Sequence, residues 1–224
     1  MPTKIEWTDE TWNVVVGCTK CGIGCENCYA ERMAVRLSAM GQEKYQRVIT
    51  AKAHSRRGEQ KWTGGIFCDK KVLNKPLHWK KPRRIFVVSM GDLFHEKVPF
   101  EFIKQVRNIA IKCPQHTLQF LTKRVSQMLR FTQWLAGHDD ISIAEWPRNC
   151  WLGVSISTQA EADEKIPILL QIPAAVRFVS YEPLLERILV PFYLESKGIG
   201  WGIVGCESIN GKAGRFQDGF VEAA

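Results

Sequence analysis

The sequence lacks the features that would place it in a membrane or direct it out of the cell. No apolar run reaches the roughly 18 residues that a membrane-spanning helix needs. The first residues, Met1–Trp7, show neither a hydrophobic stretch nor the cleavage signature of a secretory signal. We therefore expect a protein of the reducing cytoplasm that does not associate with a membrane and whose thiols stay unpaired.

The sequence also lacks the second cysteine pair that would close a common structural zinc site. Such sites usually hold four Cys or His ligands, often as two C-x2-C pairs separated by a longer segment. Four of the cysteines stand alone, and the nearest histidine downstream of the amino-terminal region, His54, is distant in sequence. The isolated cysteines are Cys68, Cys113, Cys150 and Cys206.

The other four cysteines are concentrated in one short segment near the amino terminus. Cys18, Cys25 and Cys28 have the spacing C-x6-C-x2-C, whereas Cys21 with the same final pair has the spacing C-x3-C-x2-C. Three thiolates on one glycine-containing loop suit a four-iron, four-sulfur cluster with one iron left open to a small molecule. A four-thiolate zinc site and a set of unpaired thiols are the alternatives.

Positive charge is concentrated in a basic insert, residues 41–83. Between Arg47 and Arg84, twelve Lys and Arg residues stand against two acidic ones, so this segment carries more than the whole net charge of +8. Four aromatic or imidazole side chains, Trp62, Phe67, His78 and Trp79, alternate with the basic ones. This composition is typical of a surface that contacts nucleic-acid phosphates and stacks on bases. A solvated connecting segment is the alternative.

The pattern of apolar segments predicts a single α/β domain over residues 1–224. Short buried strands alternate with helices, so we expect parallel strands with right-handed crossovers, in an open sheet or a barrel. The predicted strands are Thr11–Gly17, Arg84–Met90, Thr117–Thr122, Cys150–Ser155, Val176–Tyr181 and Gly200–Val204. The predicted helices are Asn27–Met40, Pro99–Lys112, Val125–Ala136 and Thr158–Ile172, the last kinked at Pro167 or split there into two pieces. We also predict a helical turn at Pro191–Ser196 and a hairpin around Gly64–Phe67.

Polar residues follow each of the predicted strands at its carboxyl end. In both architectures these ends meet at one edge, where the ligand binds. We expect a site there, although each polar residue taken singly could also cap a helix or form a turn. The candidate residues are Asp92, Lys123, Ser155, Glu182 and Glu207.

Several motifs, spread over nearly the whole chain, are similar to those of one known family. They are Ile5-Glu6-Trp7-Thr8-Asp9, Gly24-Cys25-Glu26-Asn27-Cys28-Tyr29-Ala30-Glu31, Ser89-Met90-Gly91-Asp92-Leu93-Phe94-His95, Leu121-Thr122-Lys123-Arg124, Ser180-Tyr181-Glu182-Pro183 and Val204-Gly205-Cys206-Glu207-Ser208. The chain thereby resembles a phage- and prophage-associated three-cysteine-motif family, which is related to the radical S-adenosylmethionine (SAM) enzymes.

This resemblance implies a partial (β/α)6 barrel of radical SAM type. It implies a four-iron, four-sulfur cluster on Cys18, Cys25 and Cys28, with SAM cleaved by one electron to start radical chemistry. The five polar residues at the strand ends would then belong to the SAM and substrate pocket. An electron donor and a protein partner encoded nearby are further expectations, and the basic insert favours a nucleotide or nucleic-acid substrate.

The sequence departs from the family pattern at three places. Cys21 stands where the family usually has another residue, and Gly205-Cys206-Glu207 replaces a more usual Gly-Gly-Glu. The chain also ends at Ala224, where relatives continue into a further helix and strand, so a truncated member without turnover is one expectation. A non-catalytic nucleic-acid-binding module that holds zinc or a cluster is the alternative from a different functional class.

Overall fold

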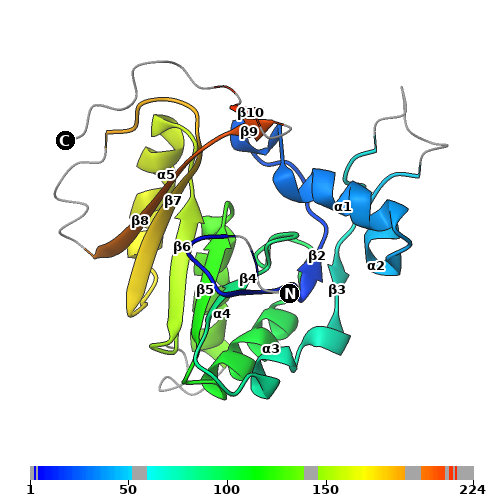
Figure 1. The fold of residues 1–224 in the computed structure, drawn as a ribbon. Helices are drawn as coiled ribbons and strands as arrows, with labels where there is room; N and C mark the ends of the chain where they lie inside the picture. The colour runs from blue at the N-terminus through cyan, green and yellow to red at the C-terminus, as the bar shows by residue number, and fades with distance from the viewer. Residues whose placement is uncertain are drawn as a thin grey trace.

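The computed structural model of the chain describes residues 3, 5–51, 60–138, 146–189, 198–209, 212–213 and 215. A curved six-stranded sheet forms its centre, in the order β1-β4-β5-β6-β7-β8, and every neighbouring pair is parallel (Figure 1). The α/β class and the parallel strands predicted from the sequence are confirmed. The strands are β1 (Glu10–Trp12), β4 (Arg84–Val87), β5 (Thr117–Thr122), β6 (Cys150–Ser155), β7 (Val176–Leu184) and β8 (Ile199–Cys206).

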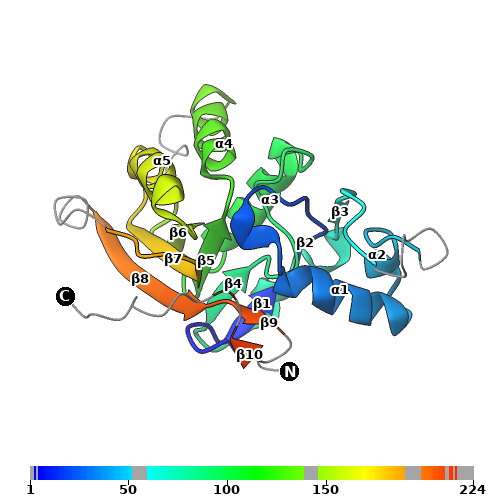
Figure 2. The ribbon, with the colours of Figure 1, turned by 90° about the horizontal axis from the view of Figure 1, so that it is seen from above.

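Three helices cover the outer side of the curved sheet, α3 (Phe100–Ile111), α4 (Val125–His138) and α5 (Gln159–Leu170), in a row that Figure 2 shows from above. Their apolar faces are buried against the outward-facing residues of the strands, and Val106, Phe131 and Leu169 are fully buried there. This burial makes the main core and leaves the inner side of the sheet for other contacts.

The inner side carries a row of large and polar residues that lie side by side across the strands. Phe86 of β4 pairs with Gln119 of β5, which pairs with Trp151 of β6, which pairs with Val176 of β7. The residues two positions further along each strand lie on the same side, because side chains alternate across a sheet. This alternation brings Ser155 and Ser180 to the inner side near the carboxyl ends.

The first predicted strand, Thr11–Gly17, is two separate strands in the structure. β1 ends at Trp12, and the side-chain oxygen of Asn13 accepts hydrogen bonds from the backbone N–H groups of Ser89 (2.8 Å) and Met90 (3.1 Å). After this break β2 (Val15–Val16) pairs antiparallel with β3 (Phe67–Cys68). The predicted hairpin around Gly64–Phe67 is therefore wrong, because its second half pairs with β2 instead.

The remaining elements are short. They comprise α1 (Tyr29–Ala39) and α2 (Glu43–Gln46), the single-turn helices η1 (Ile23–Cys25), η4 (Lys70–Val72) and η5 (Lys75–His78), and the small hairpin β9 (Ser208–Ile209) with β10 (Lys212–Ala213). Within the described ranges, no helix has the length and apolar character to cross a bilayer.

Pro167 does not split the fourth predicted helix, which continues as α5 from Gln159 to Leu170. Proline removes one backbone hydrogen bond, but Ile166 and Leu169 on either side of it are buried in the core and hold the helix together. The predicted turn at Pro191–Ser196 lies outside the described residues.

Candidate metal and cofactor site

A cavity of about 480 Å³ opens at the carboxyl ends of the parallel strands. It is lined by residues of the loops that follow β2, β4, β5 and β8 and by residues near the carboxyl ends of β6 and β7, as expected for parallel strands that end at one edge. The eight residues predicted as metal or cofactor ligands all line this cavity: Cys18, Cys25, Cys28, Asp92, Lys123, Ser155, Glu182 and Glu207. The structure thus brings together residues that are up to 189 positions apart in sequence.

Two glycines allow the cysteine loop to lie directly on the end of β6. A Cβ atom at Gly24 would lie 2.1 Å from the hydroxyl oxygen of Ser157, and one at Gly22 would lie 2.8 Å from the carboxylate of Glu161. At Gly24 the short Ser157 side chain leaves no room for a methyl group, and at Gly22 the Glu161 carboxylate would have to move aside, so glycine at both positions favours this close approach. The approach fixes the cysteines at the edge of the cavity.

The four thiols of the loop differ in their surroundings. Cys18, Cys25 and Cys28 line the cavity, whereas Cys21 does not, and Cys21 is exposed. Its sulfur nevertheless lies 3.8 Å from that of Cys25. The cavity thus favours the register that begins at Cys18, while the sulfur–sulfur contact is the feature that a four-thiolate site would need.

The acidity of the thiols also differs. Burial, with the nearby carboxylate of Asp92, raises the pKa of Cys18 to about 12. The hydrogen bond donated by Cys21 lowers the pKa of Cys25 to about 5, and the ammonium group of Lys123 adds to this effect. The same hydrogen bond raises the pKa of Cys21. Cys25 is therefore the thiol that is ready to bind a metal as a thiolate.

The donor chemistry of the cysteine loop fits an iron–sulfur cluster. Among the described residues, no three Cys, His, Asp or Glu side chains converge as the ligands of one metal ion. Three thiols from one loop nevertheless face the same cavity. The hydroxyl of Ser157, which touches the loop at Gly24, is fully buried without a hydrogen-bond partner. Thiolates are preferred by iron–sulfur clusters and by zinc, so the loop can hold either.

Asp92 is held by its neighbours and does not present a free carboxylate to the cavity. Its oxygens accept hydrogen bonds from the hydroxyl of Thr122 (2.7 Å) and from the backbone N–H groups of Phe94 (2.9 Å) and Lys123 (3.2 Å). The guanidinium of Arg124 also donates to it, at 3.3 Å. Asp92 therefore shapes the cavity wall by fixing the turn after β5.

Lys123, Ser155 and Glu182 are joined in one hydrogen-bonded group. The ammonium group of Lys123 donates to the hydroxyl of Ser155 (2.8 Å) and to the backbone carbonyl of Glu182 (3.3 Å). The carboxylate of Glu182 accepts from the hydroxyl of Ser180 (2.8 Å), another inner-face residue that lines the cavity. These contacts give the cavity one fixed positive and one fixed negative group.

Glu207 connects the end of β8 to the cysteine loop. Its carboxylate accepts hydrogen bonds from Asn27 (3.0 Å) and from the guanidinium of Arg215 (2.7 Å). Arg215 also donates to the backbone carbonyl of Ile23 (3.1 Å) and forms an ion pair with Glu26. The hydrogen bonds from Arg215 lower the pKa of Glu207 to about 2, so Glu207 is a carboxylate at neutral pH.

Sequence reasoning missed two arginines at the site. Arg124 was recognised in a motif but not as a site residue, and it contacts Asp92 and the cysteine loop. Arg215 had no sequence signal, because it lies outside the motifs and reaches the loop from a distant part of the chain. The hydrogen bonds of both arginines to the cysteine loop depend on side-chain conformation, which a single sequence does not specify.

The family model described as "Protein of unknown function (DUF5131)" matches residues 2–219. The chain belongs to this family. No curated protein and no solved structure matches it. Because the function of this family is unknown, membership assigns no activity to the chain.

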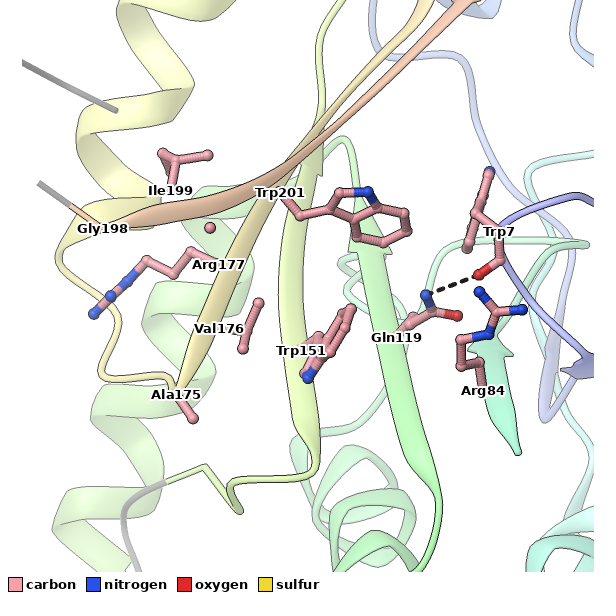
Figure 3. A pocket seen from close by; sticks show the side chains of 11 residues that line it. Trp7, Arg84, Gln119, Trp151, Ala175, Val176, Arg177, Gly198, Ile199 and Trp201 are labelled. Atoms are coloured by element: carbon pink, nitrogen blue, oxygen red, sulfur yellow. Dashed lines mark hydrogen bonds between the residues drawn. The ribbon is translucent and has the colours of Figure 1, made fainter. Parts of the chain in front are cut away.

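A second cavity, of about 640 Å³, lies on the inner side of the sheet nearer the amino ends of the strands (Figure 3). Its walls include the indoles of Trp7, Trp151 and Trp201, with ring centroids 6.0 Å apart between Trp7 and Trp201. Gln119 lies between them and donates from its side-chain nitrogen to the backbone carbonyl of Trp7 (3.2 Å). None of the predicted site residues lines this cavity.

The basic insert has exposed lysines, and of its aromatic and imidazole side chains His78 is exposed whereas Trp62, Phe67 and Trp79 are half-buried. Trp62 and Phe67 pack against the cluster beneath α1, and Trp79 lies between Lys75 (5.0 Å) and Arg83 (5.7 Å) in cation–π contacts. The described lysines that are exposed include Lys70, Lys71, Lys75, Lys80 and Lys81, whereas Lys52, Arg56 and Arg57 lie outside the described residues. Nucleic-acid binding by this segment stays a prediction that rests on charge.

Proposed function

We propose that this chain is an iron–sulfur enzyme of the radical SAM type. The observation that carries the proposal is that all eight predicted ligands line one cavity at the carboxyl ends of the strands, with the cysteine loop at its edge. The curved parallel sheet with helices on its outer side is compatible with a partial (β/α)6 barrel. Resemblance of the motifs to the radical SAM-related family supports the same function.

In this proposal Cys18, Cys25 and Cys28 hold a four-iron, four-sulfur cluster. When bound and reduced, such a cluster supplies the electron that breaks a carbon–sulfur bond of SAM and yields methionine and a 5′-deoxyadenosyl radical. The electron itself comes from a separate donor, such as a reduced flavoprotein or ferredoxin.

The chain's own residues would bind SAM and protect the radical. The carboxylate of Glu182 and the ammonium group of Lys123 offer opposite charges to the amino and carboxylate groups of SAM. Glu207 adds a second carboxylate near the loop, and Asp92 supports the wall from behind. The apolar side chains of Phe86 and Leu121 line the same cavity and exclude water from a reactive species.

The proposal is tested by counting iron and sulfide after anaerobic reconstitution. Wild-type protein should take up about four of each per chain, as a four-iron, four-sulfur cluster requires. Cys25→Ala should lose them, because a cluster held by the remaining thiols is labile. Cys68→Ala is the matched control, since Cys68 lies on β3 and does not line the cavity. Full iron retention by Cys25→Ala would remove the cluster from the proposal.

A second candidate function is a non-catalytic, zinc-holding, nucleic-acid-binding module. The distance of 3.8 Å between the sulfurs of Cys21 and Cys25 favours it, because a four-thiolate zinc site needs Cys21 close to the other ligands. Metal analysis of protein purified without added metal separates the two functions. One zinc per chain in a colourless protein supports the module, and iron with sulfide in a brown protein supports the enzyme.

A nucleotide or nucleic-acid substrate is proposed from the charge of the basic insert. Contact with phosphates releases counterions, so binding to DNA or RNA should weaken steeply as salt rises. Glutamine at Arg56, Arg57, Lys80 and Lys81 should lower both the affinity and the salt dependence. Glutamine at Lys112 and Arg130, which are exposed on the helical side, is the control. Equal effects of the two variants would make the insert a soluble connector.

A further inference from the structure

Arg124 is a buried cation in the wall of the candidate site. It is 8 % exposed and directly precedes α4 in the short connection from β5. Its Nε donates to both carboxylate oxygens of Glu96 at 3.1 Å, and its Nη1 donates to Asp92 at 3.3 Å. Two carboxylates therefore hold the guanidinium in one orientation, as a planar fork of donors allows.

The remaining donors of Arg124 face the cysteine loop. Its Nη2 donates to the backbone carbonyl and to the hydroxyl of Thr19, both at 2.8 Å, and its Nη1 lies 3.6 Å from the sulfur of Cys18. One side chain thus donates hydrogen bonds to two consecutive loop residues, Cys18 and Thr19.

His95 forms a further hydrogen bond with the Thr19 side chain. Its Nδ1 accepts a hydrogen bond from the backbone N–H of Lys97 (3.1 Å), so its proton lies on Nε2, which donates to the hydroxyl of Thr19 (2.9 Å). The Thr19 hydroxyl therefore accepts from both Arg124 and His95. With two donors fixing Thr19, the preceding sulfur is held against the guanidinium.

Among the described residues, Cys18 is the loop cysteine whose sulfur accepts from a guanidinium. Arg215 also binds this loop, but through the backbone carbonyl of Ile23 and the carboxylate of Glu26. The two arginines thus fasten the same loop in different ways. Arg124 can therefore act directly on a ligand sulfur, whereas Arg215 can act only on the conformation of the loop.

We propose that Arg124 is a positioning residue that fixes Cys18 as the first ligand of the metal centre and raises the reduction potential of the bound cluster. The inference rests on the proposed function, since it concerns the cluster held there. A hydrogen bond donated to a ligating thiolate, with a nearby positive charge, stabilises the more negative, reduced state of an iron–sulfur centre. Arg124 supplies both to Cys18.

The test compares Arg124→Lys with wild type after anaerobic reconstitution, using a reductive titration followed by electron paramagnetic resonance. Lysine keeps the positive charge but loses the fork that reaches Thr19 and Cys18 together. The cluster potential should shift to a more negative value in Arg124→Lys. Lys20→Arg, which keeps the charge and alters the contact of Lys20 with the backbone carbonyl of Glu26 in the same loop without touching a sulfur, should leave the potential unchanged.

Thr19→Val gives a second, milder variant in case Arg124→Lys does not fold. Valine keeps the shape of threonine and removes the hydroxyl that holds the guanidinium, so a smaller shift of the same sign is expected. A cluster with the wild-type potential in Arg124→Lys, or in Thr19→Val where Arg124→Lys does not fold, would overturn this inference alone. A wild-type protein that takes up no iron–sulfur cluster would overturn the proposed function and the inference with it.

Discussion

The ion pair between Glu207 and Arg215 gives a stability prediction that depends on pH. The Glu207 side chain is 3 % exposed, and its pKa falls from an ordinary value of 4.5 to about 2 because Arg215 donates hydrogen bonds to it. The change is Arg215→Met, which keeps the apolar stem and removes the charge. It leaves a buried carboxylate with the single side-chain hydrogen bond from Asn27.

The expected loss of stability is about 2 kcal/mol at pH 7. The drop in the pKa of Glu207 alone corresponds to about 3 kcal/mol. Arg215, however, is 36 % exposed, so solvent screening reduces the contribution of the pair to about 2 kcal/mol. Urea denaturation of apoprotein at several pH values measures the free energy of unfolding.

The pH dependence has a definite sign. A carboxylate whose pKa is lowered by folding contributes its full stability above the unfolded pKa, and this contribution is lost as the pH falls toward the folded pKa. The difference between wild type and Arg215→Met should therefore be constant above about pH 5 and shrink between about pH 4.5 and pH 2.

Arg47→Met is the matched control for this prediction. The ion pair of Arg47 with Glu43 is exposed on both sides, so its loss should leave the free energy of unfolding unchanged within the error of the urea measurement. Equal stability of Arg215→Met and wild type at pH 7 would refute the reasoning, and so would a difference that does not change down to pH 3.

Two further predictions concern the cysteine loop. Cys18→Ser should lose the cluster while Cys21→Ser keeps a normal cluster spectrum, because Cys18 lines the cavity and Cys21 does not; the reverse result would move the first ligand to Cys21. Gly24→Ala should destabilise the protein by about 1–3 kcal/mol and reduce cluster retention, because the added Cβ would lie 2.1 Å from the hydroxyl oxygen of Ser157. Gly137→Ala on α4 has open space and should be neutral or slightly stabilising in the same thermal melts, and equal behaviour of the two alanine variants would contradict the close approach of the loop.

Part of the fold could be predicted because buried parallel strands have a simple signature. The bounds of β5 and β6 agree with the predicted Thr117–Thr122 and Cys150–Ser155, since both are short apolar runs between clear breaks. The break at Asn13 was not predicted, because it depends on hydrogen bonds to Ser89 and Met90, more than seventy residues away. Local sequence contains no record of such contacts.

For the candidate site, too, the sequence predicts which residues are present but not the contacts that they make. Its residues could be chosen from the sequence because parallel strands end at one edge, so a polar residue after each strand must lie near the others. The role of each residue in the site could not be predicted from the sequence. Asp92 was expected to face a ligand, but four donors from its own surroundings occupy its oxygens. The roles of Arg124 and Arg215 likewise depend on contacts between distant segments.

The central claim is most directly tested by the reductive cleavage of SAM. Anaerobically reconstituted wild-type protein, reduced with dithionite in the presence of SAM, should form 5′-deoxyadenosine and methionine in equal amounts. The Cys25→Ala variant, treated in the same way, should form neither product. Wild-type protein that carries a full cluster yet forms no 5′-deoxyadenosine above the level of Cys25→Ala would contradict the assignment as a radical SAM-type enzyme.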